Sequence, residues 1–115
     1  MAYDEKLAGR VREALGERPG LTERKMFGGL AFMLGGNMCC GIVKDELMVR
    51  VGADRHAEAL AQPNARPMDF TGRSMKGMVF VSEDGCRTAA SLRRWVDLGA
   101  TFALSLPTME RALEG

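Results

Sequence analysis

The chain has 115 residues, 46% of them hydrophobic and 27% charged, which suits one folded domain with a core of its own. The 16 lysines and arginines nearly balance 15 aspartates and glutamates, so the net charge of +1 falls well short of the strongly basic balance of a dedicated nucleic-acid binder. No run approaches the ~20 apolar residues of a membrane span, and the polar start MAYDEKLAGR lacks the apolar region of a signal peptide. We therefore expect one cytoplasmic domain over residues 1–115.

The first predicted element is an amphipathic helix over residues 4–17. Asp4 is a good N-cap residue, and Arg18-Pro19-Gly20 ends the pattern. The apolar residues that fall on one face at helical spacing are Leu7, Val11, Ala14 and Leu15. Residues 21–27 then lead into strand material.

Three strands follow, predicted at 30–34, 38–43 and 46–51. Gly28-Gly29 before them indicates a bulge or a sharp bend. The connections are a three-residue hairpin loop, Gly35-Gly36-Asn37, and a tight turn at Lys44-Asp45. The segment is therefore predicted to form an antiparallel meander.

Because side chains alternate between the two faces of a strand, the loop lengths predict which residues share a face. The core face is expected to hold Leu30, Phe32, Leu34, Met38, Cys40, Ile42, Leu47, Val49 and Val51. The other face is thinner, though still fairly apolar, and is expected to hold Ala31, Met33, Cys39, Gly41, Met48 and Arg50.

The second half of the chain predicts a short helix, two strands and a long helix. The short helix covers 54–61, and the strands cover 68–70 and 78–82, with a turn at 71–73 and a loop at 74–77 between them. The long helix begins near Thr88 and is interrupted by Pro107, after which 108–113 adds a last turn. Its apolar stripe consists of Leu92, Trp95, Val96, Gly99, Phe102, Ala103 and Leu106. The order α-β-β-β-α-β-β-α predicts a two-layer α+β domain with helices against an antiparallel sheet.

The glycine-rich segment has neither the GK[ST] of a P-loop nor the G-x-G-x-x-G of a dinucleotide site, so it predicts a bent sheet. The three cysteines, Cys39, Cys40 and Cys86, are odd in number and include an adjacent pair, which favours free thiols over disulfides. Adjacent strand residues point to opposite faces, so Cys39 and Cys40 do not predict a metal site with His56, which is expected to be a solvated surface residue. Cys39, on the thinner face, is the thiol more available for reaction.

Two other features suggest contact surfaces. Met33 and Met48 are adaptable apolar side chains on the thinner face; the alternative is that residues 68–70 cover this face. Arg66, Arg73 and Lys76 make the loops around Phe70 locally basic, which suits phosphate contacts or simply solvated charge.

Four segments carry a family resemblance: RKMFGGLAFMLGGNMCCGI (24–42), DELMVRVG (45–52), RPMDFTGRSMKGMVFV (66–81) and LRRWV (92–96). In this order and spacing the chain resembles the TfoX/Sxy N-terminal domain family. The motif residues are Lys25, Met26, Phe27, Gly28, Gly29, Pro67, Met68, Asp69, Phe70 and Gly77.

The resemblance implies an α-β(3)-α-β(2)-α fold like that of type III secretion chaperones. It also implies a regulator, since the family's namesakes act with the cyclic-AMP receptor protein at competence-gene promoters. Those proteins carry a second, C-terminal domain, which we do not expect within 1–115. The resemblance implies no catalytic residues.

We therefore expect a regulatory module that binds another protein, rather than an enzyme, and that needs no cofactor or metal. Self-association is an alternative, and direct DNA binding is expected to be weak or absent. An enzyme or small-ligand binder using the Cys39 or Arg50 face is a further alternative. The candidate interaction surface consists of Met33, Cys39, Met48, Arg50, Arg66, Arg73 and Lys76.

Overall fold

The computed structural model describes residues 3–26, 28–70 and 73–107 of the chain. The elements in chain order are α1 (Glu5–Leu15), β1 (Leu21–Met26), β2 (Gly29–Leu34), β3 (Asn37–Val43), β4 (Glu46–Arg50), the 3₁₀ helix η1 (Ala53–Arg55), α2 (His56–Leu60), β5 (Ala65–Phe70), β6 (Arg73–Val81), the 3₁₀ helix η2 (Glu83–Cys86) and α3 (Ala89–Leu104). The predicted α+β class is confirmed by these elements.

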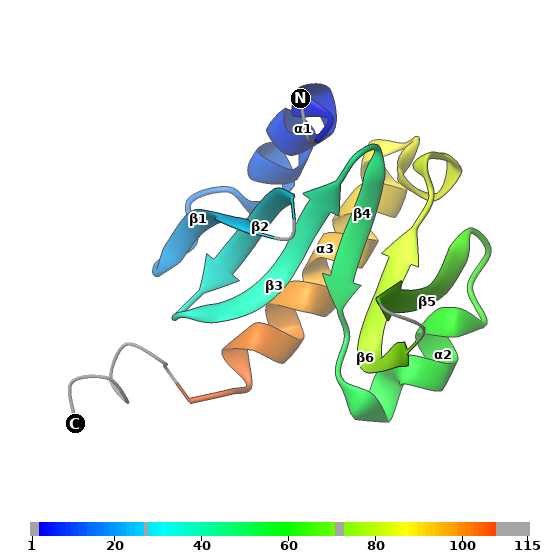
Figure 1. The fold of residues 1–115 in the computed structure, drawn as a ribbon. Helices are drawn as coiled ribbons and strands as arrows, with labels where there is room; N and C mark the ends of the chain where they lie inside the picture. Colours follow the sequence, from blue (N-terminus) through cyan, green and yellow to red (C-terminus); the bar gives the residue numbers. More distant parts are fainter. Residues whose placement is uncertain (1–2, 27, 71–72, 108–115) are drawn as a thin grey trace.

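All six strands of the described residues form one antiparallel sheet in the order β1-β2-β3-β4-β6-β5. The long helix α3 crosses behind β3 and β4 (Figure 1). Buried residues of α1, α2 and α3 belong to one cluster with the inner side chains of the sheet, so the helices share one face. We call the opposite face, which carries no α-helix of the described residues, the outer face.

Local signals place α1 as predicted. The Asp4 carboxylate accepts hydrogen bonds from the backbone N–H groups of Lys6 (2.9 Å) and Leu7 (3.3 Å), which caps the first turn. Gly16 ends the helix with a φ of 63°, a conformation that favours glycine. Leu7, Val11 and Leu15 are buried, in agreement with the predicted stripe.

Two segments are more regular than predicted. Residues 21–26, expected only to lead into a strand, form the edge strand β1, and Met26 pairs with Gly29 across a sharp turn that contains Gly28 at a φ of 73°. Residues 74–77, predicted as a loop, belong to β6. Gly77 suggested a break in the strand. It does have a φ of 88°, but the strand continues through it.

The hairpin between β2 and β3 differs from the prediction by one residue. Gly35 and Gly36, with φ values of 59° and 82°, form a two-residue turn, so that Leu34 pairs with Asn37 and Met33 with Met38. Phe32 nevertheless pairs with Cys40 as predicted. Cys39 is therefore the extra residue of a β-bulge, and the alternation of faces shifts at this point.

The helix α3 begins where predicted. The Thr88 hydroxyl accepts a hydrogen bond from the Ser91 N–H (3.1 Å) and caps the first turn. The buried residues of this helix are Leu92, Trp95, Val96, Gly99, Ala100 and Ala103. A side chain at Gly99 would clash with the Cys39 carbonyl, so the glycine lets α3 dock closely on the bulge. The helix ends at Leu104, before Pro107, and the turn predicted at 108–113 lies outside the described residues.

Candidate functional site

The centre of the outer face is closely packed around small residues. Ala31, Gly41 and Met48 are neighbours across β2, β3 and β4. A Cβ at Gly41 would lie 2.7 Å from the terminal methyl of Met48 and 2.8 Å from the Leu30 carbonyl oxygen. The Met48 side chain therefore lies across the strand beside it, over a position where only glycine fits.

Around this centre lies an outer-face patch rich in methionines. The residues of the patch are Met33, Met38, Met48, Met78, Val43 and Phe80. Met48 is only 1% exposed, and Met78 and Phe80 are 6% exposed, whereas Met33, Met38 and Val43 are half-buried. The predicted contact residue Met48 therefore fills the centre of the patch, and its accessible residues are Met33, Met38 and Val43.

In the predicted basic loops around Phe70, the Arg66 side chain packs against other residues. The Arg66 guanidinium lies 4.6 Å from the centre of the Phe80 ring and forms an ion pair with Glu46. Lys76 is exposed, and the side chains of Met68, Asp69, Phe70 and Arg73 lie outside the described part of the chain. Arg66 therefore covers the β5 side of the patch and is held there by the carboxylate of β4.

The structure contradicts the predicted position of Cys39. The bulge turns this residue to the helix side, where it is 0% exposed and its sulfur lies 3.9 Å from the Val96 carbonyl oxygen. Cys40 lies on the same side, so the expectation that the two thiols point to opposite faces is wrong. The prediction for Met38 is wrong in the opposite direction, because this residue was predicted in the core and lies on the outer face. Both errors come from the one extra residue.

The three thiols are buried, and none is available as expected for Cys39. A hydrogen bond with Cys39, together with burial, raises the pKa of the Cys40 thiol well above its ordinary value. Burial raises the pKa of Cys86 to about 11. Thiols held in the neutral form are poor nucleophiles. Within the described ranges, no three side chains among histidines, cysteines, aspartates and glutamates lie close enough to hold a metal ion.

His56 and Gly77 form a connection that the sequence did not reveal. The Gly77 N–H donates a hydrogen bond to His56 Nδ1 (2.8 Å). The Gly77 carbonyl accepts hydrogen bonds from the N–H groups of Val51 (2.8 Å) and Gly52 (3.1 Å). His56 is thus a half-buried hydrogen-bond acceptor that connects α2 to β6. The prediction that it is a solvated surface residue is wrong. A side chain at Gly77 would be strained, because its φ is 88° and an added Cβ would lie 3.1 Å from the Gly52 carbonyl carbon.

Arg50 is tied to the helix layer. Its guanidinium carbon lies 5.1 Å from the centre of the Phe102 ring on α3. The same ring packs against Gly52, where a Cβ would lie 2.5 Å from a ring carbon. Arg50 therefore helps to hold the end of α3 to the end of β4.

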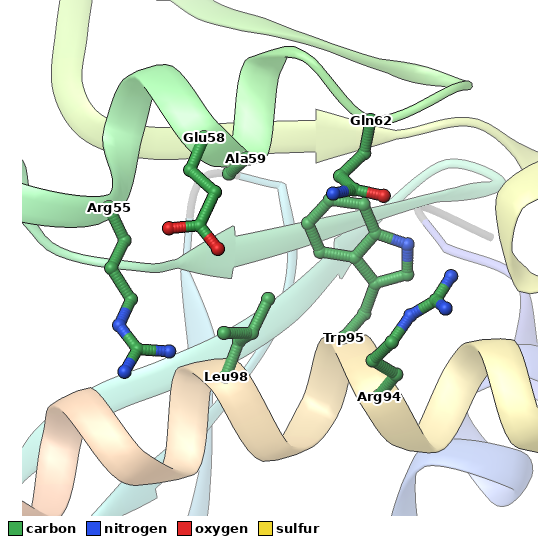
Figure 2. Close-up of a pocket in the computed structure, with 7 residues that line it drawn as sticks. All are labelled: Arg55, Glu58, Ala59, Gln62, Arg94, Trp95 and Leu98. Carbon is green, nitrogen blue, oxygen red and sulfur yellow. The ribbon is translucent and has the colours of Figure 1, made fainter.

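A groove between α2 and α3 was missed by sequence reasoning. One part of it is a hollow of about 170 Å³ lined by Arg55, Glu58, Ala59, Gln62, Arg94, Trp95 and Leu98 (Figure 2). Two neighbouring hollows of about 420 and 500 Å³ share Arg55 and Leu98 with it and continue along α3. The groove joins side chains more than 30 residues apart in the sequence, and its only local signal is the pair of arginines beside Trp95.

Comparison with known protein families finds one match that covers most of the chain. The model of the TfoX N-terminal domain matches residues 13–103, which extends from α1 into the last turn of α3. The chain belongs to the TfoX N-terminal domain family. No curated protein and no solved structure matches it, so the likeness to secretion chaperones stays a prediction. No helix in the described residues is long and apolar enough to cross a membrane.

The TfoX motif residues lie at turns and close strand contacts. Lys25 and Met26 end β1, and Gly28 and Gly29 lie in the turn and the start of β2. Phe27 lies outside the described residues. A side chain at Gly29 would clash with the Ile42 carbonyl, and Pro67 lies opposite Val79 beside the register shift of β5. Of these motif glycines, Gly29 lies where β2 and β3 approach closely, and Gly28, with a φ of 73°, lies in the sharp turn before β2.

Proposed function

We propose that this TfoX-type domain is a small regulatory module that works by binding another protein through its outer sheet face. The TfoX N-terminal domain is a regulatory type of domain family and is not a known enzyme family. Participation in transcriptional regulation, in the cytoplasm, is part of the same proposal. It rests on the resemblance to competence regulators and on a near-neutral charge that leaves DNA contact to a partner.

The observation that carries the proposal is the composition of the outer face. An antiparallel sheet with one solvated face alternates apolar residues inside and polar residues outside. Here Met33, Met38 and Val43 are half-exposed on a face that no α-helix of the described residues covers. Methionine is flexible and polarizable, which suits it to contact surfaces that must adapt to a partner.

Direct DNA binding receives less support. Of the basic residues proposed for phosphate contact, Arg66 is held by Glu46 and stacked on Phe80. Withdrawing it for a phosphate would break an ion pair and uncover an aromatic ring. A net charge of +1 supplies little of the sequence-independent attraction on which DNA binding depends.

The test is a double substitution, Met33→Lys with Met38→Lys, which places two charges on the accessible part of the patch. Light scattering over a concentration series first decides whether the wild type is a dimer or a monomer. We expect the double variant to lose at least tenfold in affinity for its partner, whether that is a second copy or a protein captured from the native cytoplasm.

The matched control is Leu104→Lys, which puts the same charge at a position that is 63% exposed at the end of α3. It should keep the wild-type association, and both variants should keep the wild-type circular dichroism spectrum. Equal loss of association in the two variants, or none in either, would contradict a contact through the outer face.

A further inference from the structure

The groove between α2 and α3 carries an alternating pattern of charge. Figure 2 shows the guanidinium groups of Arg55 and Arg94 toward opposite ends of the hollow, with the Glu58 carboxylate between them. All three side chains are exposed, and none of them has an ion-pair partner among the described residues. Along the groove the order is therefore positive, negative, positive.

Other charges lie near this hollow but do not line it. Arg93 and Asp97 line a neighbouring hollow; Arg93 is exposed, and Asp97 accepts a hydrogen bond from Arg18 (2.9 Å). Asp54 lines the next hollow along α3. The charges that line the hollow of about 170 Å³ are those of Arg55, Glu58 and Arg94.

The floor between the charges is apolar. Trp95 is 2% exposed and Ala59 3% exposed, while Leu98 is half-buried and lies in the middle of the hollow. Pockets for small-molecule ligands typically measure roughly 300–1,000 Å³, so this hollow of about 170 Å³ suits a single apolar side chain. The groove continues to Ser105, and the 11 residue steps from Arg94 to Ser105 span about 16 Å at 1.5 Å per step, or three helical turns.

We propose that this groove binds an amphipathic helix of a partner protein. One apolar side chain of that helix enters the hollow over Leu98 and Trp95. Carboxylates on both sides of it pair with Arg55 and Arg94, and a lysine or a neutral donor faces Glu58. Helix-in-groove recognition of this kind uses apolar anchors three or four residues apart, which matches the length of the groove. This surface is separate from the outer face and extends the proposed function.

A nucleic acid fits this surface less well. Its phosphates would meet Glu58 at the centre, and its backbone has no apolar group to fill the floor. A helix with the complementary order of charges avoids both penalties, because its central position need not be acidic.

The experiment selects peptides from a displayed library of helical 14-residue sequences, using the full chain as target and the double variant R55E/R94E as counter-screen. Selected peptides are titrated by fluorescence, since Trp95 is the single tryptophan of the chain and forms the floor of the groove. We expect an enriched pattern of one large apolar residue between two acidic ones. Affinity should fall about tenfold for either arginine reversal.

Two further variants make the outcome decisive. Arg24→Glu reverses an exposed arginine on β1, away from the groove, and should bind the peptide as the wild type does. Replacing the acidic residues of the peptide by lysine should restore binding to R55E/R94E and abolish binding to the wild type. The proposal is overturned if selection enriches no such pattern, if binding is unaffected by R55E/R94E, or if a DNA duplex competes at equal affinity.

Discussion

At the scale of single residues, one bulged cysteine and a few glycines decide how the sheet is built. Cys39 shifts the alternation of β3. Gly29 and Gly41 stand where another strand approaches too closely for a side chain, and Gly77 adopts a φ of 88° that favours glycine. The cysteines around the bulge are buried in the core rather than exposed for reaction. The glycine-rich segment is therefore explained by packing.

Cys86 makes the free energy of unfolding depend on alkaline pH. Its pKa is about 11 in the folded protein against an ordinary value of 9.0, so the folded state keeps a proton that the unfolded chain releases. Its contribution is complete below pH 9.0 and is lost as the pH rises toward 11. We expect a loss of about 2–3 kcal/mol over this window.

The measurement is urea denaturation of wild type and Cys86→Ser between pH 8 and 11. Serine has a similar shape and does not ionise, so the variant should show a shallower decline, and the difference between the two curves isolates Cys86 from lysines and tyrosine. Cys40, whose pKa is also raised, adds to the decline in both proteins. Parallel curves for the two proteins would contradict the assignment.

At the scale of elements, the docking of α3 on β3 is the central contact of the fold. Gly99 faces the carbonyl of Cys39, so the only glycine of this helix lies where the bulge comes closest. Capping by Thr88 and the apolar stripe were readable from local sequence. How closely the helix packs on the sheet could not be read from local sequence, because it depends on a bulge more than 50 residues away.

Gly99→Ala should lower the free energy of unfolding by about 1–3 kcal/mol, as overpacking usually does. The matched control is Gly9→Ala on α1, where an added Cβ would have no neighbouring atom within 4 Å and should gain about 1 kcal/mol from helix propensity. Urea denaturation of both variants gives the two values. A neutral or stabilising Gly99→Ala would mean that α3 can move away from the bulge at no cost.

At the scale of the whole molecule, the two proposed contact surfaces lie on different layers. The methionine patch is on the outer face, and the groove runs along the helix layer behind the sheet. Two separate surfaces would let one domain hold two partners together, in keeping with the proposed function.

We expect the two surfaces to act independently. M33K/M38K should leave the affinity of the selected groove peptide within about twofold of wild type, and R55E/R94E should leave the association through the outer face unchanged, because separated sites that share no partners contribute additively. Trp95 fluorescence and light scattering measure the two effects on the same proteins. A large cross-effect would show that the sheet transmits changes between the layers.

The sequence by itself determined the α+β class, the caps of α1 and α3, most strand positions and the family, because each depends on residues close together in the chain. Asp4 and Thr88 cap their own first turns, and alternation within a strand needs no distant partner. Only the tertiary structure decided the face of Cys39, the acceptor role of His56 and the groove beside Trp95. A one-residue bulge reverses the faces beyond it, and a hydrogen bond or groove between distant segments forms only after they pack together.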